Sequence, residues 1–164
     1  MAKDLRNIVS ALKIASNLER MGDFAGSVAK RAVTPAALPV ESPVASLSWM
    51  GETVLGMIRD VVAAYDIQDA ERDGRPQQGW AGGRGLHQPV PRIPDLYDGI
   101  AGMKESPAQI TGCTHLLFVA KSIERAGDHA TNVAENICYI VQGRLPSEER
   151  AKGDLGSFTI VEKE

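Results

Sequence analysis

Two pairs of carboxylates recur in this sequence at a spacing that suits cation binding. Leu18-Glu-Arg-Met-Gly-Asp23 matches Ile123-Glu-Arg-Ala-Gly-Asp128, 105 residues further along the chain. In each copy the Glu and the Asp are four residues apart, so on a helix both lie on the same side. Carboxylate oxygens suit hard cations such as Mg²⁺, Ca²⁺ or Mn²⁺, and they also bind iron. The candidate metal ligands are therefore Glu19, Asp23, Glu124 and Asp128.

Each acid pair is expected on the line that its helix turns toward the core. A helix turns about 100° per residue, which places Glu19 and Asp23 within about 20° of Leu12, at the centre of the first apolar stripe. The second copy has the same geometry relative to Leu117. A buried, ionised carboxylate needs a positive partner or takes up a proton, so a metal ion or a basic side chain should neutralise each row. Glu135 falls in the same row as the second pair, and Asn132 lies near it.

Two other interpretations of the acid rows lead to different functions. The first is a structural or interaction bundle whose acids form salt bridges. Arg20 and Arg125 point about 100° away from the acids, so the base would come from a neighbouring helix. The second is a di-iron carboxylate enzyme, which needs a His three residues after each Glu. Gly22 and Gly127 stand at those positions. The sequence therefore predicts that the protein is not an enzyme.

The apolar periodicity predicts three long helices, at residues 2–32, 45–72 and 107–142. Low aromatic content and many Ala residues also favour an all-α protein. Pro35 is expected to stop the first helix, and Gly143 suits the C-terminal end of the third. The second helix has a continuous apolar stripe at spacings of three and four residues, which is typical of bundle packing. That stripe consists of Leu47, Met50, Val54, Met57, Val61 and Ala64.

Composition excludes several classes of protein. The chain has 164 residues and a net charge of −3, which does not suit a polycationic nucleic-acid binder. No apolar run approaches the roughly 20 residues that cross a bilayer, so direct membrane insertion is not expected. Cys113 and Cys138 form neither a zinc motif nor a disulfide framework and are interpreted as core residues in a cytoplasmic protein.

The two acid-bearing segments resemble the PhoU family of phosphate-transport regulatory proteins. The resemblance rests on Lys13-Ile-Ala-Ser-Asn-Leu-Glu-Arg-Met-Gly-Asp23 and on Leu116-Leu-Phe-Val-Ala-Lys-Ser-Ile-Glu-Arg-Ala-Gly-Asp-His-Ala-Thr-Asn-Val-Ala-Glu135. It implies tandem three-helix bundles in a cytoplasmic homodimer, here in incomplete form. It also implies metal clusters on the acid rows, with iron, zinc, magnesium or manganese as the ion. By matching position, the implied ligands are Glu19, Asp23, Glu124 and Asp128, and Glu135 and Asn132 are weaker candidates. The implied role is negative regulation of phosphate uptake and of the phosphate-starvation response, together with the ATPase of the phosphate ABC transporter and a sensor histidine kinase.

Two departures from the family pattern modify these expectations. About a third of a typical member is expected to be missing at the N-terminus, which should leave the apolar face of the first helix exposed. Residues 73–102 do not resemble the family, either because the reading frame is disturbed there or because they form a natural loop, so a damaged, non-functional copy is an alternative. The long helices 45–72 and 107–142 are then expected to pair as an antiparallel hairpin. The expected organisation is a first-bundle remnant at 1–34, a linker at 35–44, a second bundle at 45–143 with an irregular insert at 73–105, and a polar tail at 144–164.

Overall fold

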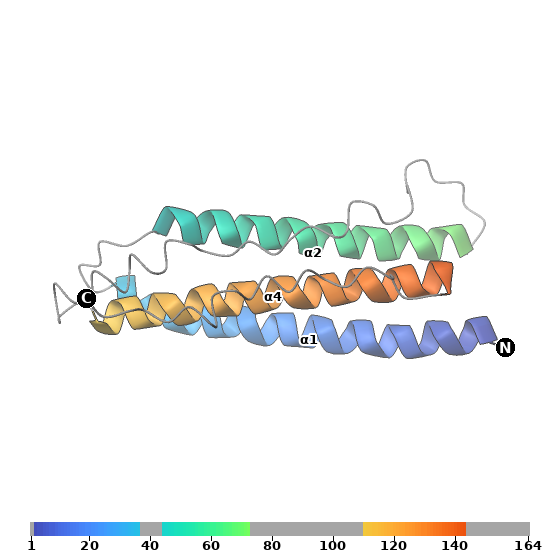
Figure 1. Ribbon diagram of the computed structural model, residues 1–164, viewed down its shortest axis with the longest axis horizontal. Helices are drawn as coiled ribbons and strands as arrows, with labels where there is room; N and C mark the ends of the chain where they lie inside the picture. The colour runs from blue at the N-terminus through green and yellow to red at the C-terminus, as the bar shows by residue number, and fades with distance from the viewer. Residues whose placement is uncertain (1, 37–43, 73–109, 144–164) are drawn as a thin grey trace, which may run out of the picture.

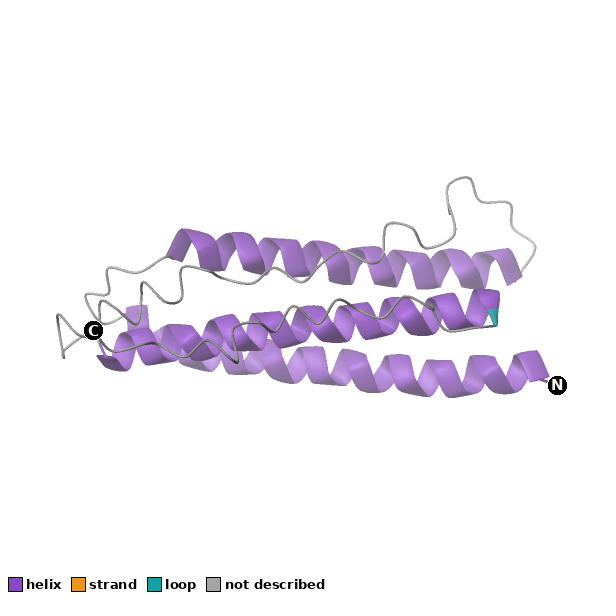
Figure 2. Cartoon of the chain, viewed as in Figure 1, coloured by secondary structure: helices purple, strands orange, loops and turns teal. Residues whose placement is uncertain are grey.

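Three long helices make up the described part of the protein. The computed structural model describes residues 2–36, 44–72 and 110–143. Helix α1 spans Ala2–Ala36, α2 spans Val44–Arg72 and α4 spans Ile110–Gln142 (Figures 1 and 2). These residues contain no strand, which confirms the predicted all-α class. The predicted irregular insert at 73–105 and the predicted polar tail at 144–164 lie outside the described residues.

Helix α4 lies between the other two helices. It packs against both α1 and α2, whereas the backbones of α1 and α2, as far as they are described, do not approach each other closely (Figure 1). Arg6 of α1 lies over the ring of Tyr139, and Arg31 lies over that of Phe118, so α1 runs antiparallel to α4. These stacked Arg side chains fasten the interface near both ends of α1.

Helix α2 runs parallel to α4, so the predicted antiparallel hairpin is wrong. Leu47 near the start of α2 packs with Val119 and Ala120, in the first third of α4. The later part of the α2 stripe packs among residues from Ala126 to Ile140 (Figure 1). Short connections make neighbouring helices antiparallel, but α2 and α4 are separated by residues 73–109, and that length of chain imposes no direction.

One buried cluster joins all three helices and confirms the predicted α2 stripe. All six residues of that stripe are buried, and Met50 and Val61 are among the most completely covered side chains of the described residues. Helix α4 contributes small side chains, including Ala130 and Ala134, together with Val133 and Ile137. Small residues let helices approach closely, while the larger Met and Ile side chains fill the remaining space.

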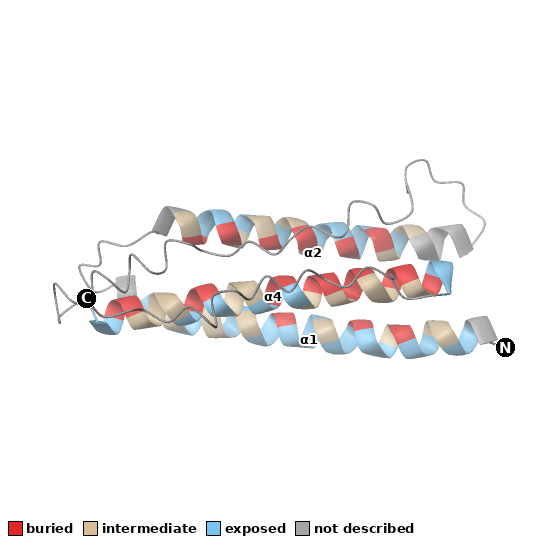
Figure 3. Ribbon diagram, in the orientation of Figure 1, coloured by how far each residue is buried: buried red, intermediate tan, exposed pale blue. Residues whose placement is uncertain are grey.

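Helix α1 packs on α4 through the face opposite to the one predicted. Ser10, Ile14 and Met21 are buried, whereas Leu5 and Leu12 are 63% and 68% exposed. Figure 3 shows α1 exposed along most of its length, with a few buried positions between. The expectation that the line through Leu12 faces the core is therefore wrong. The separate expectation from the family resemblance, that α1 has an exposed apolar face, is confirmed.

The helix ends also differ slightly from the prediction. Helix α1 continues through Pro35 to Ala36 instead of stopping at residue 32. Gly143 ends α4 as predicted, with φ of 75° and its N–H donating to the carbonyl oxygen of Tyr139 at 2.9 Å. Only glycine adopts that left-handed conformation without steric strain. None of the three described helices combines the length and the apolar character that crossing a bilayer requires.

Candidate functional site

The acid pair of α1 is on the solvent side of the helix. Glu19 and Asp23 are both exposed. Asp23 lies about 160° around the helix from the buried Met21, because two residues turn the helix by about 200°. Arg20 Nη1 lies 3.9 Å from Asp23 Oδ2, one turn away, so the long Arg side chain does reach an acid of its own helix. Both side chains are about two-thirds exposed, and such a pair contributes at most about 1 kcal/mol.

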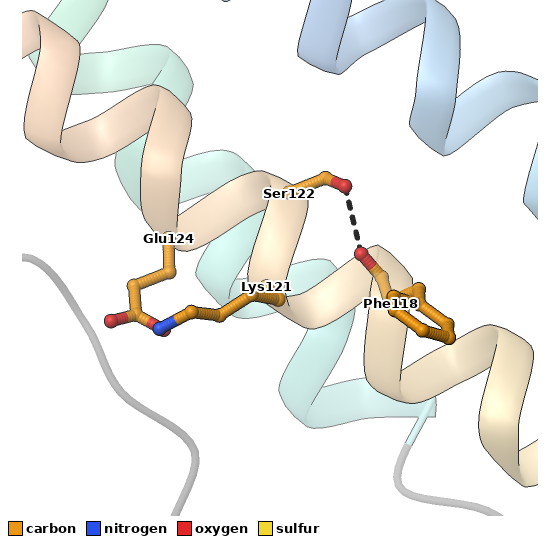
Figure 4. A network of polar contacts seen from close by, with 4 residues as sticks. All are labelled: Phe118, Lys121, Ser122 and Glu124. Atoms are coloured by element: carbon orange, nitrogen blue, oxygen red, sulfur yellow. Dashed lines mark hydrogen bonds and ion pairs between the residues drawn. The ribbon is translucent and has the colours of Figure 1, made fainter.

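The acid pair of α4 is less open to solvent. The side chain of Glu124 is 20% exposed, and its Oε2 accepts a hydrogen bond of 3.0 Å from Lys121 Nζ (Figure 4). Nearby, Ser122 Oγ donates to the carbonyl oxygen of Phe118 at 2.8 Å. Asp128 is exposed. Asp128 lies about 160° around α4 from Ala130, which is fully buried, so this row also does not face the centre of the core.

The structure does not bring the two acid pairs together. They stand on different helices, and the α1 pair faces away from α4. Within residues 2–36, 44–72 and 110–143, no three His, Cys, Asp or Glu residues are grouped closely enough to hold a metal ion. An octahedral Mg²⁺ needs six oxygen ligands, and two carboxylates supply only part of that number. The described residues therefore do not complete a metal site by themselves, and metal binding at the four acids stays a prediction.

A polar cluster between α1 and α4 was missed by the sequence analysis. Asn17 Oδ1 lies 2.7 Å from His129 Nδ1 and accepts a hydrogen bond of 3.3 Å from Asn132 Nδ2. Asn17 Nδ2 donates to the carbonyl oxygen of Lys13 at 2.7 Å, which fixes the amide so that Oδ1 faces α4. With Oδ1 as the acceptor, we assign the ring proton of His129 to Nδ1.

This Asn17–His129–Asn132 cluster has a structural role. The His129 ring also packs against Phe24, with ring centroids 5.6 Å apart. Partly buried polar groups are costly to leave unpaired, so the cluster favours one register of α1 on α4. Asn132, predicted as a weak ligand, is thus engaged with α1. The available signal in the sequence was that Asn17 shares a helical face with the buried Ile14 and Met21.

The two cysteines are buried and free, as predicted for core residues. Burial raises the pKa of the Cys138 thiol, and the charge of Glu135 raises it further. A raised pKa lowers the fraction of reactive thiolate. The negative charge of Glu135, the other weak ligand candidate, therefore helps to keep the buried Cys138 thiol protonated.

The fold and the acid pairs define a class, a helical-bundle protein with a repeated carboxylate motif. A model of the PhoU domain matches residues 1–32 and 95–137, which contain both acid pairs. The chain is 36% identical over 163 residues to the phosphate-specific transport system accessory protein PhoU homolog of Rhizobium meliloti, covering 96% of this chain. It is 38% identical over 161 residues to the homolog of the same name in Caulobacter vibrioides, covering 94% of this chain. The chain belongs to the PhoU family.

The extent of these matches differs between the family model and the relatives. The chain spans just under two thirds of its relatives, with 65% of the Rhizobium meliloti protein and 66% of the Caulobacter vibrioides protein covered. The family model leaves residues 33–94 unmatched and resumes at residue 95, inside the segment 73–102 that was predicted to diverge. The similarity to the family therefore begins again earlier than the sequence analysis placed it.

Proposed function

We propose that this protein is an accessory regulator of phosphate transport. The observation that carries the proposal is the match of more than nine-tenths of the chain to relatives named phosphate-specific transport system accessory proteins. The match includes both copies of the acid motif, and the structure folds each copy as one long helix. Long helices with exposed side faces suit recognition of other proteins, which is the work of an accessory protein.

The proposed partners are the ATPase of the phosphate ABC transporter and a sensor histidine kinase. The regulator would act at the cytoplasmic side, where it lowers phosphate uptake and holds down the phosphate-starvation response. Assembly as a homodimer belongs to the same proposal. The family resemblance supports these points, and each is open to a direct binding or sedimentation measurement.

The regulatory role can be tested in a bacterium that lacks its own PhoU homologue. The full chain is expressed there, and phosphate uptake and a phosphate-starvation reporter are measured against an empty vector. The proposal predicts lower uptake and lower reporter activity when the chain is present. Unchanged uptake and reporter activity, with folded chain detected in the cells, would contradict it. An Ile137→Asp variant, which places a charge at a fully buried position, serves as the inactive control.

Metal binding is proposed for the α4 pair in combination with further ligands. Glu124 is the better shielded of the two Glu candidates, and shielding from water strengthens the attraction between a carboxylate and a cation. Metal content is measured by elemental analysis of the purified chain and of a Glu124→Ala/Asp128→Ala variant. A Glu52→Ala/Asp60→Ala variant, which removes two exposed acids of α2, is the matched control. The proposal predicts metal loss in the first variant alone.

A structural bundle whose acids form salt bridges is the second candidate function. The contact of 3.0 Å between Lys121 and Glu124 favours it, because the acid already has a positive partner. This alternative predicts the same metal content in the wild-type chain and in both variants. Replacing Lys121 by Met would then lower stability by no more than about 1 kcal/mol, as expected for a partly exposed ion pair.

A further inference from the structure

The acid pair of α4 carries a base of its own. Lys121 Nζ lies 3.0 Å from Glu124 Oε2, one helical turn away, and donates a hydrogen bond to it (Figure 4). The Glu124 side chain is 20% exposed and so is largely shielded from water. Hydrogen bonds from an ammonium to a carboxylate are shorter and stronger than those between neutral groups. Glu124 therefore already holds a cation, and the chain itself supplies it.

The internal repeat shows that this base belongs to one copy of the motif only. The offset of 105 residues makes Ser16 of α1 the counterpart of Lys121 in α4. Ser16 is exposed, and its short side chain carries no charge. Glu19, the counterpart of Glu124, therefore has no ammonium one turn before it. The two acid pairs have the same carboxylates and differ in the base placed before the Glu.

The contact between Lys121 and Glu124 adds little to the fold. Both residues stand on α4, three positions apart, so their contact joins no two helices. Pairs at this spacing stabilise a helix only slightly. The Asn17–His129–Asn132 cluster, in contrast, connects α1 to α4. Packing alone therefore does not explain why a base is seated on Glu124.

The ammonium of Lys121 can leave Glu124 at low cost. The Lys121 side chain is 57% exposed, and its flexible four-carbon stem can carry the ammonium into water. Breaking a partly exposed ion pair changes an equilibrium by about fivefold or less. Two positive charges on one carboxylate repel each other, so a second cation that reaches Glu124 displaces the ammonium.

We propose that Lys121 is a built-in competitor for the cation site at the α4 acid pair. While its ammonium is on Glu124, the pair is closed to a divalent cation, and the cation binds by displacing the ammonium into water. The ion pair and the bound metal are then two states of the same carboxylate. This inference rests on the metal binding proposed for the α4 pair, and it gives that site a residue that regulates its affinity.

Mn²⁺ alone serves as the first probe, because electron paramagnetic resonance measures the unbound ion directly. The full chain is titrated at about 0.15 M salt as wild type, as Lys121→Gln and as Arg125→Gln. Lys121→Gln should bind Mn²⁺ about three- to fivefold more tightly, because Glu124 no longer holds an ammonium. Arg125 is exposed and points about 100° away from Glu124, so Arg125→Gln should stay within about twofold of the wild-type affinity.

A second measurement follows the ammonium itself. The lysine side chains are methylated with isotope-labelled methyl groups, which keeps their charge, and magnetic resonance spectra are recorded while Mg²⁺ is added. The Lys121 signal is assigned by its absence from Lys121→Arg. It should move toward the position of the exposed Lys13, whose own signal should stay unchanged. In Glu124→Ala/Asp128→Ala the Lys121 signal should have that position before Mg²⁺ is added.

The outcomes separate this inference from the metal proposal. If Glu124→Ala/Asp128→Ala loses Mn²⁺ binding and Lys121→Gln binds no more tightly than the wild type, the site exists but Lys121 does not compete for it, which overturns the inference. An equal gain in Arg125→Gln also overturns it, because nearby charge then acts without the contact. If the wild type and all variants bind Mn²⁺ equally weakly, the metal proposal fails, and the inference fails with it. Circular dichroism confirms that each variant is folded.

Discussion

Replacing Ile14 and Leu12 by Ala in separate variants should give very different losses of stability. The two residues are neighbours in sequence and similar in size, but Ile14 is 5% exposed in the shared core and Leu12 is 68% exposed. Truncating a buried Ile to Ala costs about 2–5 kcal/mol, through lost burial and the cavity left behind. Truncating an exposed Leu changes stability by about 0.5 kcal/mol or less, and Ala is the better helix former.

The two variants and the wild-type chain are unfolded by heating, and the helical signal at 222 nm is followed by circular dichroism. For a chain of this size each kcal/mol shifts the melting temperature by about 2–4 °C, so Ile14→Ala should melt about 4–20 °C lower. Leu12→Ala should melt within about 2 °C of the wild-type chain. Equal losses for both variants would refute the placement of α1, because they would mean that both faces of the helix are covered.

Three further predictions follow from the described packing. Ala134→Leu should lower stability by about 1–3 kcal/mol in a urea titration, because Ala134 is fully buried and a larger side chain has no space. Asn17→Ala should lower it by about 1–3 kcal/mol, because His129 loses its partner, and a His129→Ala/Asn17→Ala double variant should lose less than the sum of the single variants. Burial and the charge of Glu135 raise the pKa of the Cys138 thiol, so stability should fall as the pH rises above the ordinary thiol pKa, where the unfolded chain releases the proton more readily. Cys138→Ser should weaken that decline, and an undiminished decline would contradict the assignment to this thiol.

The helices could be predicted from the sequence because their patterns have a single interpretation. In α2 the stripe from Leu47 to Ala64 is the dominant apolar row, and every member of it is buried. Gly143 was predictable as the end of α4 because a helix commonly ends on a glycine with a positive φ. Patterns of this kind depend on residues that are close in sequence, so the folded structure keeps what they predict.

The orientation of α1 could not be predicted because this helix has two apolar faces. Leu5 and Leu12 form one row, and Ile14 and Met21 form another on the opposite side. Periodicity favours the row of Leu5, Ile8 and Leu12, which recur at helical spacing. Which row is covered depends on the helices that lie beside it. The parallel packing of α2 and α4 was also missed. The relative direction of two helices depends on the path of the chain that connects them, and no periodic pattern within the helices specifies that path.

The candidate site was predictable in its residue types but not in its surroundings. The repeat located Glu19, Asp23, Glu124 and Asp128 correctly as two pairs at helical spacing. The helical turn of 100° per residue then placed both pairs toward the core, because Leu12 and Leu117 were taken as the residues that face the core. Glu19, Asp23 and Asp128 are in fact exposed, and the partly covered Glu124 has Lys121 as its partner. The Asn17–His129–Asn132 cluster joins residues more than 100 positions apart, which no local pattern could connect.

The most direct test of the account is the accessibility, in the intact chain, of the α1 face that carries Leu5 and Leu12. A Leu12→Cys variant is treated with a maleimide reagent at neutral pH, and the two natural cysteines, both buried, serve as internal controls. The account predicts that Cys113 and Cys138 react slowly and that the new thiol at position 12 reacts about as fast as a free thiol. Three equally slow thiols in a folded chain would show that this face is covered, and would contradict the placement of α1.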